Sequence, residues 1–343
     1  MSYRDDQLII KAELYAKMPI MLKLLIVKTS SLGDVVHNLP IINDILSHYP
    51  DTEIDWVVEA GFADIPKLHP GVKHVIPVAI RRWRKALFTK KTWSEIKVAK
   101  QQLSQQRYDL VLDTQGLLKS ALLTYLSQGK KHGYDKNSAR EPLASYFYDT
   151  THQVSRAEHA VARNRTLAAL ALGYPIPSGL PNYDITVAMQ SQLALKTPYI
   201  VGLHGTSRDS KLWPIEHWVA LGKKLTELQI GLILPWASEA ELKRAEFIAS
   251  ALGNATVLPK LTITQLANVI GQAKAAIGVD TGLSHLATAL GIPTIAIYTD
   301  TNPALTGVYA GAQAPAINLG NIGKIPSVED VTTALDKMLN NNF

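Results

Sequence analysis

The feature that most constrains the fold is an alternation that begins at Leu22 and runs through the chain twice. Short apolar, β-branched runs suited to buried strands alternate with longer amphipathic stretches suited to helices. This order predicts parallel sheets covered by helices on both faces, because parallel strands need long crossover connections. The segment GYPIPSGLPNYD (173–184), with three prolines and two glycines, interrupts the alternation as a linker would. The sequence therefore predicts an α/β protein with two units of similar size.

The same pattern places the individual elements. Strands are expected at 23–27, 54–58, 74–78 and 110–113 in the first half, and at 199–204, 232–235, 275–279 and 294–298 in the second. Helices are expected at 35–46, 92–105, 117–127, 157–172, 215–228, 239–251, 264–273, 283–290 and 328–339. The 47% hydrophobic residues suffice for two cores, which we assign to residues 21–180 and 181–343. Packing of the C-terminal helix back on the first domain is one option.

Composition narrows the class of protein. No apolar run is long enough to span a membrane, and charged residues interrupt residues 1–20, which argues against a signal peptide. We expect a cytoplasmic protein, with residues 1–20 either an extension ahead of Met21 or an amphipathic helix that touches a membrane or partner. The absence of cysteine excludes disulfides, thiolate metal sites and cysteine nucleophiles. The net charge of +6 favours an anionic partner, but the aromatic residues are too scattered for nucleic-acid stacking, so no nucleic acid is expected.

Four polar loops follow predicted strands. They are KTSSLGD (28–34), DTQG (113–116), HGTSRDSK (204–211) and VDTGLSH (279–285). Ligands of open parallel sheets bind beyond the carboxyl ends of the strands, and these loops come from both halves, so we predict a cleft between the domains. The chain has no dinucleotide fingerprint, Walker A loop, zinc-protease helix or hydrolase nucleophile elbow, and we predict neither a metal nor a cofactor.

The loop at 279–285 has the features of a phosphate seat. Asp280, Thr281 and Gly282 precede a predicted helix, whose free N–H groups and positive end favour an anion. Gly282 would let the ligand approach the backbone, and His285 adds an imidazole. Alternatively, Asp280 or Thr281 only caps the helix, and His285 is a surface or core histidine.

The loop at 204–211 offers hydroxyls and a cation. Thr206 and Ser207 follow a buried strand, and Lys211 could stabilise a departing diphosphate in place of a divalent cation. Alternatively, Thr206 and Ser207 belong to a turn and Lys211 is a solvated charge.

The first loop carries a carboxylate where a glycine-rich loop would be expected. Ser30, Ser31 and Gly33 form a polar turn, and Asp34 falls at the start of the next helix. An ionised carboxylate there could accept the proton of an attacking hydroxyl. A serine cap with an acid in the first helical turn gives the same pattern without catalysis.

A run of cations follows the third strand in AIRRWRKALF (79–88), which we expect to be a loop. Arg81, Arg82 and Arg84 would suit a polyanionic ligand if this loop borders the cleft, because guanidinium groups match phosphate and carboxylate. Arg140 could extend the basic surface. A solvated charged face is the alternative.

Several of these stretches resemble one known family. The segments LLIVKTSSLGDVVHNLP (24–40), DTQGLLKS (113–120), AREPLASYFY (139–148), TSRDSKLWP (206–214) and VDTGLSHLATAL (279–290) are similar, in order, to the lipopolysaccharide heptosyltransferases of glycosyltransferase family 9 in Gram-negative bacteria. The resemblance covers roughly residues 21–308 and both domains. It implies a GT-B fold, in which two Rossmann-like domains with parallel sheets face each other across a cleft.

The resemblance also implies a reaction and a set of site residues. It implies inverting transfer of L-glycero-D-manno-heptose from ADP-heptose to the first Kdo of Kdo2-lipid A, by a protein peripheral to the cytoplasmic face of the inner membrane. Asp34 matches the general base, and Lys211 the cation beside the leaving group. The remaining donor positions are Thr206, Ser207, Glu241, Leu261, Asp280, Thr281, Gly282 and His285. Ser207 stands where the family has threonine, and Leu261 where it has methionine. The acceptor side comprises Ser30, Ser31, Gly33, Arg81, Arg82, Arg84 and Arg140.

Three alternatives compete with this hypothesis. A later-acting heptosyltransferase of the family would have a similar donor site, and a non-catalytic nucleotide-sugar-binding protein would bind the donor without releasing ADP. A nicotinamide oxidoreductase is disfavoured by the missing dinucleotide fingerprint.

Overall fold

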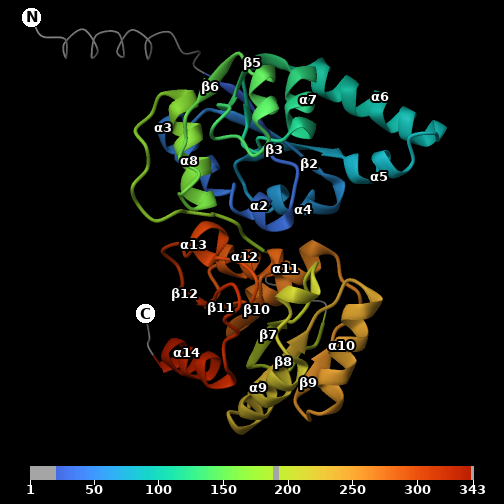
Figure 1. Ribbon diagram of the computed structural model, residues 1–343, viewed down its shortest axis with the longest axis vertical. Helices are drawn as coiled ribbons and strands as arrows, with labels where there is room; N and C mark the ends of the chain where they lie inside the picture. The colour runs from blue at the N-terminus through green and yellow to red at the C-terminus, as the bar shows by residue number, and fades with distance from the viewer. Residues whose placement is uncertain (1–20, 188–192, 341–343) are drawn as a thin grey trace, which may run out of the picture.

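The computed structural model describes residues 21–187 and 193–340, so the hypotheses on residues 1–20 lie outside the described residues. Two lobes lie one above the other, each built on a six-stranded parallel sheet with helices on its faces (Figure 1). This confirms the predicted fold class. No helix of the described ranges has the length and apolar character needed to cross a membrane.

The first sheet has the strand order β3-β2-β1-β4-β5-β6. Its strands are β1 (Lys23–Val27), β2 (Glu53–Glu59), β3 (Val72–Val78), β4 (Arg107–Asp113), β5 (Gln128–Tyr134) and β6 (Thr150–His152). Its helices are α2 (Leu32–Val36), α3 (Pro40–His48), α4 (Asp64–Lys67), α5 (Ile80–Lys85), α6 (Lys90–Gln105), α7 (Leu118–Leu126) and α8 (Ala160–Leu172), with 3₁₀ turns η1 (Ala60–Phe62) and η2 (Pro142–Phe147). The order reverses between β1 and β4, which is where such sheets bind ligands.

The second sheet repeats this topology with the order β12-β11-β10-β7-β8-β9. Its strands are β7 (Tyr199–Leu203), β8 (Gly231–Leu234), β9 (Ala255–Val257), β10 (Ala275–Val279), β11 (Thr294–Tyr298) and β12 (Ala316–Gly320). Its helices are α9 (Ile215–Glu227), α10 (Glu239–Ser250), α11 (Ile263–Gly271), α12 (Gly282–Ala289), α13 (Pro303–Thr306) and α14 (Val328–Asn340), with the 3₁₀ turn η3 (Asp209–Lys211). The reversal here lies between β7 and β10, so all four predicted loops follow the strands at the two reversals.

Three expectations about local structure are corrected. The helix expected at 35–46 is two helices, because Pro40, which has no N–H group, starts α3 afresh. The basic run expected as a loop forms the short helix α5. The helix α14 packs with its buried side chains, among them Leu335 and Met338, in the core of the second sheet beside α9, β11 and β12, rather than back on the first domain.

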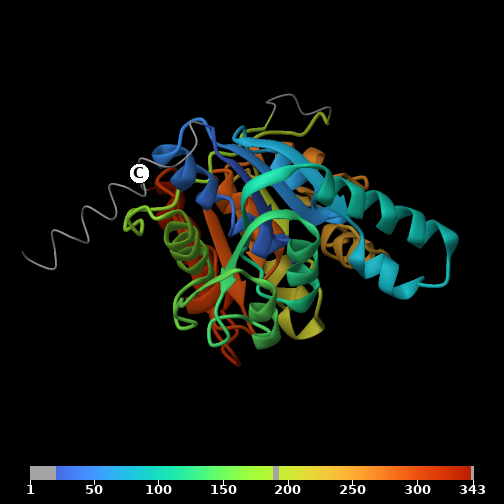
Figure 2. The ribbon, with the colours of Figure 1, turned by 90° about the horizontal axis from the view of Figure 1, so that it is seen from above.

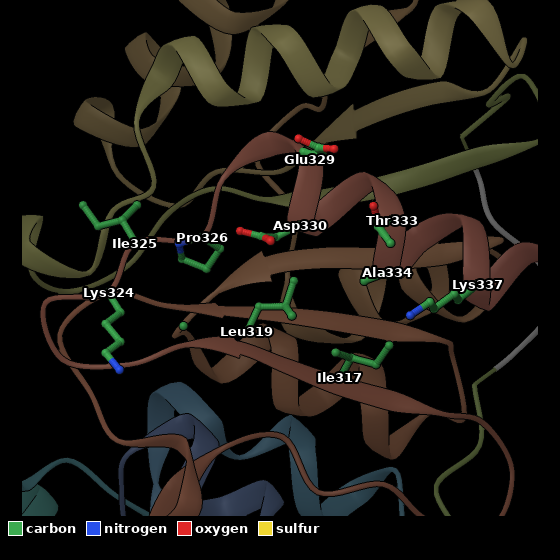
Figure 3. Close-up of a pocket in the computed structure, with 11 residues that line it drawn as sticks. Ile317, Leu319, Lys324, Ile325, Pro326, Glu329, Asp330, Thr333, Ala334 and Lys337 are labelled. Atoms are coloured by element: carbon green, nitrogen blue, oxygen red, sulfur yellow. The ribbon is translucent and has the colours of Figure 1, made fainter.

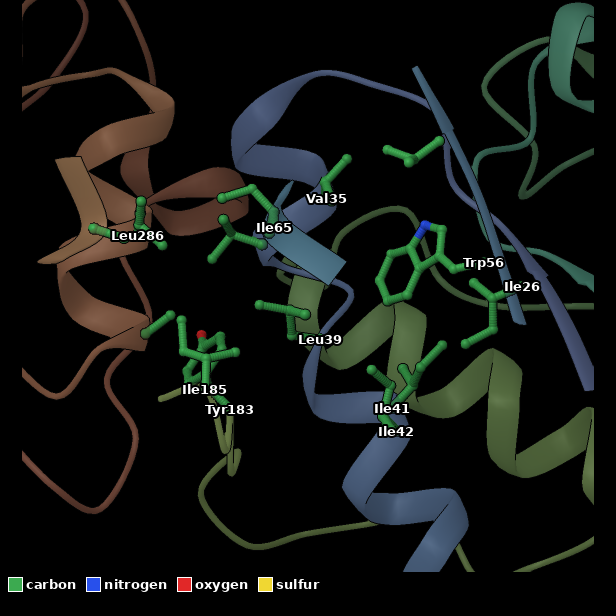
Figure 4. Packing of buried hydrophobic residues seen from close by; sticks show 14 of the residues in the cluster. Ile26, Val35, Leu39, Ile41, Ile42, Trp56, Ile65, Tyr183, Ile185 and Leu286 are labelled. Atoms are coloured by element: carbon green, nitrogen blue, oxygen red, sulfur yellow. The ribbon is translucent and has the colours of Figure 1, made fainter. Parts of the chain in front are cut away.

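One hydrophobic cluster extends through both lobes. Val35 and Leu39 from the first lobe belong to it together with Leu286 of α12, and Figure 4 shows these side chains around Ile65 and Ile185. The helices α2 and α12 therefore meet in the interior, and the carboxyl ends of β1 and β10 face the same space between the lobes.

Candidate active site between the lobes

A cleft of about 520 Å³ lies where the loops after β1, β7 and β10 meet. Twelve of the residues singled out from the sequence line it: Ser31, Gly33, Asp34, Arg81, Arg140, Thr206, Ser207, Lys211, Asp280, Thr281, Gly282 and His285. The first five come from the first lobe and the other seven from the second. The structure thus brings together residues that lie up to about 250 positions apart in the chain, such as Asp34 and His285.

Asp34 is held at the third position of α2 by the residue that caps this helix. Its Oδ2 atom accepts hydrogen bonds from the Ser31 backbone N–H at 2.7 Å and from the Ser31 hydroxyl at 2.8 Å. The predicted helix cap by Ser31 and Asp34 is therefore present, and it uses one of the two carboxylate oxygens. Oδ1 makes no hydrogen bond within the described ranges, and Asp34 lines the cleft, so the cap orients the side chain and leaves this oxygen for a ligand.

The rest of the first loop is supported from behind by the loop after β4. Gln115 accepts hydrogen bonds from the backbone N–H groups of Thr29 and Ser30 at 3.0 and 3.1 Å, and Lys119 donates to the Ser30 hydroxyl at 2.6 Å. Ser30 is buried and supports the loop instead of lining the cleft. Asp113 of the same loop is fully buried and accepts hydrogen bonds from the Tyr148 hydroxyl and the Gln115 backbone N–H.

On the second lobe, Lys211 and Asp280 form an ion pair with Nζ and Oδ2 2.6 Å apart. Both side chains are largely buried, with 14% and 11% of their area exposed. The Thr206 hydroxyl donates to the Asp280 backbone carbonyl at 2.8 Å, which ties the two loops together. Lys211 is thus a positioned cation and not a solvated one.

The start of α12 faces the same space. Thr281 is the N-cap residue and Gly282 the first residue of the helix. A Cβ atom on Gly282 would lie 2.3 Å from Leu32 Cδ2 and 2.9 Å from the Gly33 backbone nitrogen. The glycine therefore lets the first turns of α2 and α12 approach closely across the cleft.

Three histidines link the lobes behind the cleft. His37 Nε2 and His285 Nδ1 are 3.0 Å apart, the His159 ring lies 5.2 Å from that of His37, and His159 is hydrogen-bonded to the Gly307 carbonyl at 3.0 Å. Burial lowers the pKa of His285 to about 4 and lowers the pKa values of His37 and His159 as well. The cluster is therefore uncharged at neutral pH. His285 is both a cleft residue and part of this core contact.

Four other predicted residues lie away from the cleft lining. Arg82 pairs with Glu95 of α6 at 2.8 Å, and Arg84 is exposed, so we no longer place these two at the acceptor. Glu241 accepts hydrogen bonds from the backbone at the start of α10, and its side chain lies against Gly205. Leu261 is partly buried against the core cluster.

The sequence analysis missed a second hollow of about 360 Å³ that adjoins the first. It shares Asp34 and Arg140 with the cleft and adds the cations Lys28, Arg156 and Arg163. Lys28 is buried with its Nζ donating to the Thr114 carbonyl, and burial lowers its pKa. Arg156 follows the strand β6, which was not predicted, and Arg163 lies within the predicted helix at 157–172, where a single arginine gives no signal of a site.

A larger hollow of about 610 Å³ lies elsewhere, between β12 and α14 (Figure 3). Isoleucine, leucine and proline side chains line it with a few charged residues such as Asp330 and Lys337. None of the residues singled out from the sequence lines this hollow, so size alone does not mark the site.

The fold and cleft match a known family. The model described as glycosyltransferase family 9 (heptosyltransferase) matches residues 96–337. The chain belongs to glycosyltransferase family 9. It is similar to lipopolysaccharide heptosyltransferase 1 of Pseudomonas aeruginosa, with 46% identity over 88% of this chain and 84% of that protein.

Solved structures of the family agree. The structure of E. coli heptosyltransferase WaaC with ADP has 43% identity and a TM-score of 0.85, and covers 92% of this chain and 99% of that one. The structure of WaaC with ADP-2-deoxy-2-fluoro heptose has 42% identity and a TM-score of 0.82, with the same coverage. The chain is a family 9 glycosyltransferase of the heptosyltransferase type, with the GT-B fold, and acts in lipopolysaccharide synthesis.

Proposed function

We propose that this heptosyltransferase transfers L-glycero-D-manno-heptose from ADP-heptose to the first Kdo of Kdo2-lipid A, with inversion, during inner-core lipopolysaccharide synthesis. The observation that carries the proposal is that Asp34 of one lobe and Lys211 with the start of α12 of the other line one cleft. The solved structure of WaaC with a fluoro analogue of ADP-heptose supports the choice of donor.

Asp34 acts as the general base. The acceptor hydroxyl attacks the anomeric carbon while its proton passes to Asp34 Oδ1, and the bond from that carbon to the β-phosphate oxygen breaks with its electron pair leaving on ADP. Attack on the face opposite the leaving group inverts the anomeric centre. The two hydrogen bonds from Ser31 to Oδ2 hold the carboxylate in place during the transfer.

Lys211 stabilises the departing diphosphate. Asp280 holds the ammonium at the cleft, so the charge is positioned before the donor arrives. The N–H groups at the start of α12 and the hydroxyls of Thr206, Ser207 and Thr281 complete a phosphate seat that needs no metal ion. Gly282 and His285 shape its wall, and we place Glu241 and Leu261 toward the nucleoside.

The second hollow receives the acceptor. Lys28, Arg140, Arg156 and Arg163 line it together with Asp34, and the three arginines would pair with the carboxylates of the Kdo sugars. Arg81, in the adjoining cleft, adds a fifth positive charge. The acceptor is a lipid, so we propose that the protein works peripherally at the cytoplasmic face of the inner membrane.

Mass analysis of Kdo2-lipid A after incubation with ADP-heptose and the protein tests this function. The expected product is heavier by one heptose, and one equivalent of ADP is released. A later-acting enzyme would leave Kdo2-lipid A unchanged and modify only an acceptor that already carries heptose. A non-catalytic binding protein would retain ADP-heptose without releasing ADP on either acceptor.

A further inference from the structure

The positive charge of the chain is concentrated in one hairpin. Residues 80–100, which form α5, a short loop and the first part of α6, contain eight lysines and arginines and one acid. The net charge of this stretch is +7, whereas the whole chain carries +6. The remainder of the protein therefore carries a net charge of −1, and this hairpin is the densest run of positive charge in the sequence.

The hairpin also exposes large apolar side chains among these charges. Phe88 at the tip is 103% exposed, Trp93 61%, Val98 52% and Leu87 46%. Figures 1 and 2 both show α5 and α6 projecting outward beyond the rest of the first lobe. Aromatic and aliphatic side chains interleaved with lysines are typical of surfaces that insert into the interface of an anionic bilayer.

The base of the hairpin is fixed, so this exposure is built into the fold. Trp83 is buried in the core of the first lobe, and its indole N–H donates to Glu95 of α6 at 2.8 Å. Arg82 pairs with the same carboxylate, and the Thr89 hydroxyl caps α6 by accepting from the Thr92 N–H. These contacts hold α5 against α6 and leave the apolar tip without partners among the described residues.

The hairpin starts at the candidate active site. Arg81, in the first turn of α5, lines the cleft and lies 5.5 Å from the Phe62 ring centroid. From Arg81 the chain reaches Phe88 through four helical and three loop steps, which span at most roughly 16 Å, so the tip lies within about that distance of the cleft wall. A bilayer that receives the tip would therefore lie beside the mouth of the cleft, within reach of the head group of a lipid acceptor.

We infer that the α5–α6 hairpin is the membrane-docking element of this enzyme, in which Leu87, Phe88 and Trp93 enter the interface of an anionic phospholipid bilayer while Lys85, Lys90 and Lys91 contact its phosphates. The docking orients the cleft toward acceptor lipids of the same bilayer. The inference rests on the proposed function, because the lipid acceptor explains why the hairpin lies next to the cleft.

Vesicle flotation tests the inference, with phosphatidylcholine vesicles that contain or lack about 30% phosphatidylglycerol. The wild-type protein should bind the anionic vesicles and not the neutral ones. Phe88→Ser/Trp93→Ser should weaken this binding roughly tenfold or more, and Lys90→Ala/Lys91→Ala several-fold. The matched control is Leu228→Ser/Phe247→Ser in the second lobe, where the side chains are 50% and 61% exposed, and it should bind as the wild type does.

Turnover separates docking from catalysis. The hairpin variants should keep wild-type turnover on a deacylated, water-soluble acceptor and lose turnover on acceptor embedded in vesicles. The inference is overturned if Phe88→Ser/Trp93→Ser binds vesicles as strongly as the wild-type protein does. It is also overturned if the protein binds no vesicles and instead binds single-stranded RNA in a way that depends on the hairpin. Hairpin-dependent vesicle binding without heptose transfer to either acceptor would support docking and refute the proposed function.

Discussion

Closure of the two lobes at the active site depends on Gly282, and replacing it with alanine should separate α2 from α12. The added methyl would lie 2.3 Å from Leu32 Cδ2, 2.7 Å from Leu32 Cβ and 2.9 Å from the Gly33 nitrogen. Carbon atoms pack at about 3.5–4.0 Å, so the first contact is short by more than about 1 Å. Because one of the three atoms belongs to the backbone, a rotamer change of Leu32 cannot relieve the whole clash.

Overpacking of this kind costs about 1–3 kcal/mol, which corresponds to a loss of roughly 5- to 150-fold in the population of the closed arrangement. We expect kcat/KM of Gly282→Ala to fall within that range. The assay is ADP release at low donor concentration, accompanied by small-angle scattering to follow the separation of the lobes. Gly61→Ala is the control, because a Cβ there would meet nothing within 4 Å.

A second substitution distinguishes closure from a local defect of the phosphate seat. Leu32→Ala removes the methyl that the new Cβ meets first, so it should restore part of the activity in the Gly282→Ala background. A defect confined to donor contacts would not respond to Leu32. Activity of Gly282→Ala within twofold of wild type, or no recovery in the double variant, would refute the reasoning.

Three further outcomes follow from the site. Lys211→Ala should weaken ADP binding roughly 10- to 150-fold and slow transfer, because the substitution removes a charged phosphate contact and leaves Asp280 unpaired. An unchanged ADP affinity, measured by calorimetry, would count against the proposed role of Lys211. Arg140→Ala should raise the KM for the acceptor about tenfold and leave the KM for the donor unchanged, since Arg140 lines both hollows. A change in the donor KM alone would contradict the placement of Arg140 at the acceptor. The pKa of His285 is about 4 in the folded chain and about 6.5 in the unfolded one, so the unfolded chain binds more protons between these values and stability falls as pH drops below about 6.5. Denaturant titrations should give a lower free energy of unfolding at pH 5 than at pH 7, and equal or greater stability at pH 5 would be inconsistent with the buried neutral cluster.

Much of the fold could be predicted because the strands beside the two reversals are apolar and buried. The runs at 23–27, 275–279 and 294–298 coincide with β1, β10 and β11. The strands β5, β6, β9 and β12 were not predicted, and β5, with the sequence QGKKHGY, is too polar to show a strand pattern. Neighbouring strands and the chain order supply its place in the sheet, and a local pattern cannot reveal these.

The lining of the cleft was predictable where a loop follows a strand at a reversal, as for Asp34, Thr206 and Asp280. Of the three arginines in this run only Arg81 lines the cleft. Arg82 lies about 100° around the helix from Arg81 and pairs with Glu95, whereas Arg84 lies almost a turn further along α5 and is exposed. The contact of His37 with His285 joins residues 248 positions apart and depends on how the lobes dock. No local pattern carries that information.

In the proposed transfer, Asp34 receives the acceptor proton while the second lobe holds the donor. The most direct measurement compares turnover and ADP-heptose affinity for Asp34→Asn, whose amide oxygen can still accept the hydrogen bonds from Ser31. We expect kcat to fall about 10²- to 10⁴-fold while the donor dissociation constant stays within about twofold. Near-normal turnover, or a loss of donor affinity as large as the loss of rate, would contradict it.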